Sequence, residues 1–282
     1  MKTTLLMVWC AFVVVGPARA QVTTGSQGSV TYGHHHLNVT DVAAHKRFWI
    51  DALGGRALKI GESPAEIVAF PGVLVFLAAR APSAGTKGST VNHLGFETQN
   101  IRAAVDRLKA AGFPMVTRAE LPATYEVRDD LGRGPGGNTV AFVMGPDETK
   151  VELIENTALA SSLAMHHVHF STPDVAAMRA WYAKTFGAVP GTRSGMQAAD
   201  LSGVNLTFNQ APEAVAPTRG RALDHIGFEV KNLEAFCKQL EAGGFKLDRG
   251  YTKVPALGIA VAFLTDPWGS YIELTEGLPV PR

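Results

Sequence analysis

An internal repeat limits the architecture of this 282-residue chain more than any other feature of its sequence. Residues 36–44 are matched by residues 169–177, and residues 92–97 are matched by residues 224–229. Equivalent positions lie 132 or 133 residues apart up to about residue 120, and 121 residues apart after it. The repeat predicts two similar modules in tandem, the first of which carries about a dozen extra residues.

Each module divides again into two units of the same order. Residues 34–39 predict a strand and residues 42–53 a helix, and the same order returns at residues 94–97 and 101–111. Short extended runs follow each helix. The sequence therefore predicts an α+β fold of four strand–helix–strands units, with the module boundary at residues 156–163.

The extra residues of module one lie between Tyr125 and Asn138. This stretch is rich in glycine and charged residues, which is typical of a connection between regular elements. We expect a long loop there.

The N-terminus has the features of an export signal. Lys2 precedes eleven apolar residues at 5–15, and Ala18-Arg19-Ala20 has the small-x-small pattern of a cleavage site. The apolar run is shorter than the roughly 20 residues that span a bilayer. We expect residues 1–20 to be a cleaved signal peptide and the mature protein to be exported, either periplasmic or secreted.

The charge of the remaining chain limits its partners. Residues 1–20 hold two basic and no acidic side chains, so 24 basic and 25 acidic side chains remain. A nearly neutral protein has no electrostatic reason to bind nucleic acid or an anionic membrane, and we expect neither as a partner. Cys10 lies in the predicted signal, which leaves Cys237 without an intrachain disulfide partner. We expect Cys237 to be a buried apolar residue.

Histidines recur at the starts of the predicted strands. Side chains on a strand alternate between its two faces, so His34 and His36 share one face, and the apolar residues beside them pack on the helix. The repeat places His167 and His169 in the same way. These histidines are therefore expected on the open face of a sheet.

The second unit of each module adds further histidines and glutamates to the open face. His93 and Glu97 share a face of one strand, as His225 and Glu229 do in module two. One more glutamate lies on the last strand of each module. These two residues are Glu152 and Glu273.

Two histidines and one carboxylate per module suit a divalent transition metal such as Fe, Mn, Zn or Ni. Three protein ligands leave coordination positions open, as catalytic sites require. The candidate ligands are His34, His93, Glu152, His167, His225 and Glu273.

The motifs around these residues resemble those of the vicinal oxygen chelate superfamily. They include His93-Leu-Gly-Phe-Glu97, His225-Ile-Gly-Phe-Glu229 and Asp266-Pro-Trp-Gly-Ser-Tyr-Ile-Glu273. That superfamily contains glyoxalase I, fosfomycin- and bleomycin-resistance proteins and extradiol dioxygenases. The resemblance implies βαβββ units with curled mixed sheets, in modules at residues 30–157 and 163–279.

The resemblance also implies a function. The six candidate ligands match the metal ligands of the superfamily, in which substrate oxygens chelate the ion. It implies a lyase, isomerase or dioxygenase-like enzyme that acts on a small oxygen-chelating molecule, as a monomer or a homodimer. The alternative is a non-catalytic protein that binds and sequesters a small molecule, like the bleomycin-resistance proteins.

The chain departs from the family pattern at three places. Glyoxalase I has a fourth ligand, a glutamate, on the last strand of its first unit, whereas residues 73–77 and 204–208 contain none. Phe263 replaces the tyrosine of the extradiol dioxygenase signature. The turn at residues 145–148 lacks the Asp-Pro-x-Gly pattern.

Four further residues are candidates for contacting a substrate or moving a proton. His36 and His169 would line the site, and Glu97 and Glu229 would orient a ligand or act as a base.

The sequence leaves the pairing of the units open. If unit one pairs with two and unit three with four, the ligand sets are those of the two modules: His34, His93, Glu152 and His167, His225, Glu273. Pairing of unit one with four and two with three gives the sets His34, His225, Glu273 and His93, Glu152, His167. The short connections make sequential pairing the first expectation.

Overall fold

The computed structural model describes residues 29–61, 64–211 and 214–281, so the predicted signal peptide lies outside the described residues. The four βαβββ units of the predicted α+β fold are confirmed. No helix in the described ranges is long and apolar enough to span a membrane.

The units have the following elements. Unit 1 contains β1 (Val30–Val39), α1 (Val42–Lys46), a π-helical turn (Arg47–Ala52), β2 (Arg56–Leu58), β3 (Glu66–Phe70) and β4 (Val73–Ala79). Unit 2 contains β5 (Val91–Thr98), α2 (Ile101–Ala110), α3 (Thr117–Glu120), β6 (Glu126–Arg128), β7 (Leu131–Arg133), β8 (Thr139–Met144), a 3₁₀ turn (Pro146–Glu148) and β9 (Lys150–Glu155). Unit 3 contains β10 (Leu163–Thr172), α4 (Val175–Phe186), β11 (Val189–Arg193), β12 (Met196–Leu201) and β13 (Val204–Gln210). Unit 4 contains β14 (Leu223–Val230), α5 (Leu233–Ala242), β15 (Arg249–Val254), a 3₁₀ turn (Pro255–Leu257), β16 (Ile259–Thr265) and β17 (Tyr271–Glu276).

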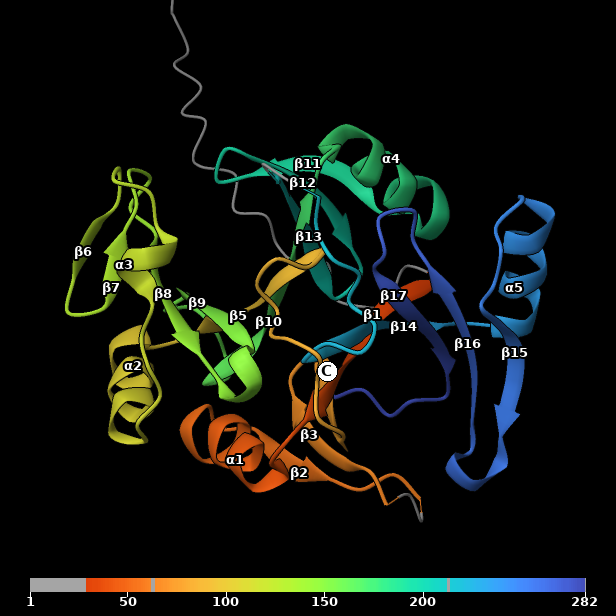
Figure 1. The fold of residues 1–282 in the computed structure, drawn as a ribbon, viewed down its shortest axis with the longest axis horizontal. Helices are drawn as coiled ribbons and strands as arrows, with labels where there is room; N and C mark the ends of the chain where they lie inside the picture. The colour runs from red at the N-terminus through yellow and green to blue at the C-terminus, as the bar shows by residue number, and fades with distance from the viewer. Residues whose placement is uncertain (1–28, 62–63, 212–213, 282) are drawn as a thin grey trace, which may run out of the picture.

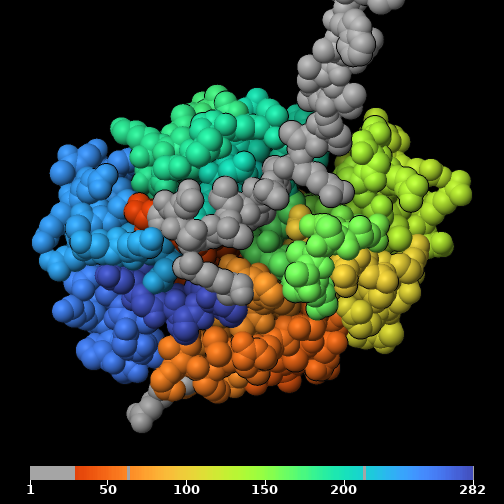
Figure 2. Space-filling view, turned by 180° about the vertical axis from the view of Figure 1, so that it is seen from behind, coloured from red at the N-terminus to blue at the C-terminus, as the bar shows by residue number. Residues whose placement is uncertain are grey.

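The strands form two mixed sheets. One has the order β15-β16-β17-β14-β1-β4-β3-β2, and the other has the order β11-β12-β13-β10-β5-β9-β8-β7-β6. Unit 1 therefore shares a sheet with unit 4, and unit 2 shares one with unit 3; we call them sheet 1+4 and sheet 2+3. Figure 2 shows unit 1 (orange) in contact with unit 4 (blue) on one side and unit 2 (yellow to green) on the other.

The expectation of sequential pairing was wrong, and the connection lengths give the reason. The link between units 2 and 3, residues 156–162, is shorter than the links at residues 80–90 and 211–222. The short link lets β10 return in the same sheet and pair antiparallel with β5. The two longer links cross from one sheet to the other.

Side-chain caps begin the helices where the sequence predicts them. The Asp41 carboxylate accepts hydrogen bonds from the backbone N–H groups of Ala43 and Ala44, and Asp174 does the same for Ala177. α4 ends at Gly187, which adopts a left-handed conformation with φ of 74°. The caps fix where the chain leaves β1 and β10, the two strands that carry the first histidines.

One hydrophobic core holds both sheets together. It includes Trp49 and Phe96 of units 1 and 2, and Phe170 and Phe228 of units 3 and 4, all fully buried. The helices α1, α2, α4 and α5, one from each unit, lie on the outside of the strands (Figure 1). Cys237 belongs to this core and is 3% exposed, which confirms the expectation of a buried apolar residue.

The expected long loop at residues 125–138 is partly ordered as a hairpin. β6 and β7 pair antiparallel around Asp129 and Asp130, both of which have positive φ values. Aspartate tolerates positive φ values better than most residues, so the two aspartates can form the tight turn of the hairpin. Tyr125 and residues 134–138 lie outside the hairpin and remain irregular.

Candidate metal sites

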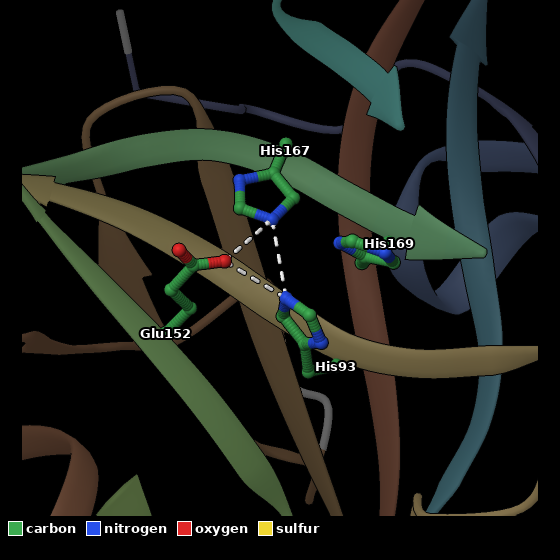
Figure 3. Close-up of side chains that lie close together, drawn as sticks. All are labelled: His93, Glu152, His167 and His169. Carbon is green, nitrogen blue, oxygen red and sulfur yellow. Dashed lines mark hydrogen bonds and ion pairs between the residues drawn. The ribbon is translucent and has the colours of Figure 1, made fainter. Parts of the chain in front are cut away.

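The first candidate site lies on sheet 2+3, where three neighbouring strands bring their ligand atoms together. His93 Nε2 on β5 lies 2.9 Å from Glu152 Oε2 on β9, and His167 Nε2 on β10 lies 3.2 Å from the same oxygen. The two ring nitrogens are 3.3 Å apart. Figure 3 shows these three side chains pointing toward one another. We call this group site 2+3.

These separations fit one divalent ion. With metal–ligand bonds of about 2.1 Å, neighbouring ligands lie roughly 3.0 Å apart in an octahedron and roughly 3.4 Å apart in a tetrahedron. The three measured distances fall between or close to these values. Burial alone would raise the pKa of the Glu152 carboxyl, but the hydrogen bonds with His167 and His93 hold it well below its ordinary value. The carboxylate is therefore ionised and ready to bind a cation.

The second candidate site lies at the equivalent place on sheet 1+4. Glu273 Oε2 on β17 is 2.9 Å from His34 Nε2 on β1 and 2.9 Å from His225 Nε2 on β14. All three ligand atoms lie within 4.8 Å of one another. We call this group site 1+4. Each site thus combines ligands from both modules.

A glycine at the centre of each site makes room for the ligands. Gly95 lies opposite His167 on one neighbouring strand and opposite Glu152 on the other. A Cβ atom on Gly95 would lie 2.0 Å from the His167 ring. Gly227 lies opposite His34 and Glu273 in the same way, and its Cβ would lie 1.9 Å from the His34 ring. The glycine of the His-x-Gly motif is therefore a steric requirement of the site.

The hydrogen-bond partners behind the ligands differ between the sites. His93 Nδ1–H donates to the neutral Asn92 amide oxygen at 2.9 Å, whereas His225 Nδ1–H donates to the Asp224 carboxylate at 2.7 Å. Such bonds fix the tautomer that leaves Nε2 free for a metal. Only site 1+4 adds a second negative charge through this partner.

The pKa values of the two histidines follow this difference. Burial lowers the pKa of His93 to about 4, against the smaller raising effect of Glu152. Burial also opposes the charged form of His225, but its bonds with Asp224 and Glu273 raise its pKa above the ordinary value. Burial would raise the pKa of Asp224 too, yet its hydrogen bonds, led by that from His225, lower it to about 2.

His36 and His169 lie beside the ligand rings. The ring of His169 is 4.3 Å from that of His93, and the ring of His36 is 4.5 Å from that of His225. One nitrogen of His169 lies within 4.8 Å of the three ligand atoms of site 2+3, so His169 joins that group. His36 instead stacks on Phe76, with ring centroids 5.7 Å apart.

Glu97 and Glu229 bind groups outside the ligand sets. Glu97 accepts a hydrogen bond from Asn156 Nδ2 at 2.9 Å and lies 3.4 Å from His166. Glu229 accepts from the Thr275 hydroxyl at 2.8 Å and from the backbone N–H of residue 277. Both carboxylates are engaged at strand ends. Their roles in orienting a ligand or in proton transfer remain predictions.

The sheet face beyond the ligands also differs between the sites. In sheet 1+4, Leu74 and Phe76 lie opposite His34 and His36, and they pack in a separate apolar cluster that includes Leu278. In sheet 2+3, the residues opposite the corresponding histidines are Asn205 and Thr207, with Asn209 two residues on. Site 1+4 therefore has an apolar border where site 2+3 has a polar one.

Sequence reasoning missed several residues of these surroundings. His166 occupies a β-bulge before His167, is 4% exposed, and contacts both His167 and the guanidinium of Arg193. Lys150, two residues before Glu152, is 2% exposed and binds Glu120 at 2.6 Å. A signal for Asn92 and Asp224 was present, since each directly precedes a ligand histidine in the repeat. The contact of His166 with Arg193 and that of Lys150 with Glu120 join segments that are distant in the sequence, so they leave no such signal.

Two solved structures resemble this fold over most of its length. Glyoxalase I from Zea mays aligns with a TM-score of 0.69 and 15% identity, covering 88% of this chain and 92% of that one. A protein described as a putative dioxygenase from Bacillus subtilis aligns with a TM-score of 0.62 and 12% identity, covering 92% of this chain and 87% of that one. Compared with curated protein sequences, the chain gives no significant match.

The sequence itself matches a family model in both modules. The matched segments are residues 31–153 and 164–274, which include all six candidate ligands and both central glycines. These segments make up most of the chain. The chain therefore belongs to the Glyoxalase/Bleomycin resistance protein/Dioxygenase superfamily.

Proposed function

We propose that this protein is an exported, metal-dependent enzyme that acts on a small molecule able to chelate an ion through two oxygens. The observation that carries the proposal is the spacing of the ligand atoms in site 2+3, at 2.9, 3.2 and 3.3 Å. A structural metal site would surround its ion completely, whereas three protein ligands on one sheet face leave room for a substrate.

The side chains of the chain have separate tasks in this proposal. The histidine–glutamate sets hold the ion, which when bound would polarise the substrate oxygens as a Lewis acid. Phe142 and Phe263 meet the rings of His93 and His225 edge to face, at 5.3 and 5.8 Å, and shield them on one side. His36 and His169, beside the ligand rings, are the candidates for moving a proton.

The proposed reaction class is that of a lyase, an isomerase or a dioxygenase. The proposal is supported by the related folds, which include a glyoxalase I and a putative dioxygenase. The neutral charge balance of the chain supports a small-molecule substrate over nucleic acid.

The metal content of the protein tests the proposal. The protein would be purified from the exported fraction without chelators, and its metals and N-terminus would be measured by mass spectrometry. Two equivalents of a transition metal per chain, with cleavage after residue 20, would support the proposal. Iron would direct the substrate search to oxygenation, and zinc, nickel or manganese to isomerase or lyase chemistry.

Two outcomes would contradict the proposal. A protein that binds no metal after reloading, yet binds a small ligand tightly, would be a sequestering protein of the bleomycin-resistance kind. An uncleaved chain that remains inside the cell would refute export without affecting the metal sites.

A further inference from the structure

His169 has one ring nitrogen that no other group of the described residues uses. Its Nε2 lies 2.9 Å from Asn209 Oδ1, whereas its Nδ1 is buried and has no hydrogen-bond partner. The residue as a whole is 9% exposed. A buried nitrogen without a partner is costly unless something occupies its lone pair.

Asn209 determines which nitrogen is free. Its Oδ1 also accepts a hydrogen bond from the Ser171 hydroxyl at 3.1 Å, and its Nδ2 donates to the backbone oxygen of residue 210 at 3.2 Å. These two contacts fix the orientation of the amide, so Oδ1 faces His169. His169 therefore donates from Nε2–H, and its Nδ1 carries the lone pair.

This histidine belongs to the group of ligand atoms on sheet 2+3. One of its ring nitrogens lies within 4.8 Å of the ligand atoms of His93, Glu152 and His167. Two ligands on opposite sides of an ion are about 4.2 Å apart when each bond is about 2.1 Å. Figure 3 shows a nitrogen of His169 turned toward the other three side chains. Because Asn209 occupies Nε2, Nδ1 is the ring nitrogen whose lone pair is available to the ion.

The equivalent histidine in sheet 1+4 lacks these features. Ala78 occupies the position on β4 that corresponds to Asn209 on β13, so no amide orients the His36 ring. Phe76 stacks on that ring, in the place where sheet 2+3 has Thr207. His36 is accordingly absent from the group of ligand atoms formed by His34, His225 and Glu273 in the described chain.

We propose that His169 is a fourth protein ligand of site 2+3 through Nδ1, positioned by Asn209, and that site 1+4 has three ligands only. The inference rests on the proposed metal function. It assigns different roles to His36 and His169, which are both candidates for moving a proton in that proposal. His169 holds the ion, and His36 remains the unattached histidine of site 1+4. In an octahedron, site 2+3 keeps two open positions, which is the number a chelating pair of oxygens needs.

Cobalt binding tests this ligand set without an assay of activity. The metal-free purified protein would be titrated with Co²⁺ against a chromophoric chelator, and the Co²⁺ protein would be studied by proton NMR. We expect five paramagnetically shifted, exchangeable imidazole N–H signals. His169→Ala should remove one signal and weaken Co²⁺ binding at one of the two sites by about 100-fold or more. Loss of a residue that only contacts a ligand typically weakens metal binding by about 10–100-fold, so a direct ligand should reach or exceed that range.

His36→Ala is the matched control, because it alters the equivalent position of the other sheet. It should keep all five signals and both affinities. His169→Asn and His169→Gln add a second test, which also serves if the alanine variant fails to fold. The asparagine oxygen replaces Nδ1 and the glutamine oxygen replaces Nε2, so asparagine should retain more affinity than glutamine.

The results separate this inference from the proposed function. Two tight sites that are unchanged in His169→Ala, or four signals in the unaltered protein, would overturn the fourth ligand alone. Better binding by the glutamine variant than by the asparagine variant would overturn coordination through Nδ1. Failure of the unaltered protein to bind Co²⁺ at all would refute the proposed function together with this inference.

Discussion

The imidazole ring of His167 lies over Gly95 on the neighbouring strand, in space that a Cβ atom on Gly95 would occupy at 2.0 Å from the ring. Gly227 has the same relationship to His34. The strand register brings the candidate ligands together. The absence of a side chain at Gly95 and Gly227 then leaves the space in which one histidine ring of each site lies.

Replacement of either glycine by alanine should cost one metal site. Gly95→Ala should displace His167 and reduce the bound metal from two equivalents to one, and Gly227→Ala should do the same through His34. The displaced ring should also lower the free energy of unfolding by about 1–3 kcal/mol, as overpacking does. Metal analysis and urea denaturation would measure both effects.

Gly191 on β11 provides the control for these variants. A Cβ atom there would meet nothing within 4 Å, so Gly191→Ala should keep both equivalents. If Gly95→Ala retained both equivalents of metal, the His167 ring would be able to bind the ion from a different position, which would contradict the prediction.

Pairs of ligand substitutions test how the units combine. His34 and Glu273 belong to one site, so the double variant His34→Ala/Glu273→Ala should keep one equivalent of metal. His34→Ala/Glu152→Ala alters both sites and should keep none. Equilibrium dialysis with elemental analysis would give the counts. The reverse result, one equivalent for the second pair, would mean that units 1 and 2 share a site.

The carboxylate behind His225 should strengthen metal binding in site 1+4. Asp224→Asn reproduces the neutral partner that His93 has in Asn92, and it should weaken site 1+4 by about 10–100-fold, as loss of an outer-shell partner does. Site 2+3 should keep its affinity. A titration that resolves the two sites would measure the change.

The reciprocal substitution checks the cause. Asn92→Asp places a carboxylate behind His93 and should tighten site 2+3. If both substitutions weaken their sites equally, the effect comes from disturbed packing, and the charge of the partner is not the reason.

The stability of the metal-free protein should fall as the pH is lowered from about 6.5 to about 4. His93 has a pKa of about 4 in the folded protein, because burial disfavours its charged form. The unfolded chain takes up this proton near its ordinary pKa, so between the two values the unfolded state binds more protons. The loss should reach about 3 kcal/mol for His93 alone. Urea denaturation at pH 6.5 and pH 4.5 would measure it.

A His93→Gln variant should lose less stability over the same pH interval, because it removes the buried imidazole. His225 acts in the opposite direction. Because its pKa is raised in the folded protein, its protonation stabilises the fold at pH values below its ordinary pKa, and this contribution is lost as the pH rises through the raised pKa. A variant whose stability depends on pH as steeply as that of the unaltered protein would exclude His93 as the cause.

The sequence by itself predicted the candidate ligands and the strand face on which they lie. Strand alternation places His34 and His167 opposite the apolar side chains that pack on the helices, and the repeat identifies their partners in the other units. Because these rules act over a few residues, they predicted four strand–helix–strands units. The family resemblance implied the βαβββ order and a metal-binding role for the open-face histidines and glutamates.

Only the tertiary structure decided which units share a sheet. Both pairings complete two sets of two histidines and one glutamate, so composition and spacing cannot separate them. The seven residues 156–162 keep units 2 and 3 in one sheet, while longer links cross between the sheets. The free Nδ1 of His169 was hidden for the same reason: it depends on Asn209, whose position opposite Ser171 exists only once β13 has paired with β10.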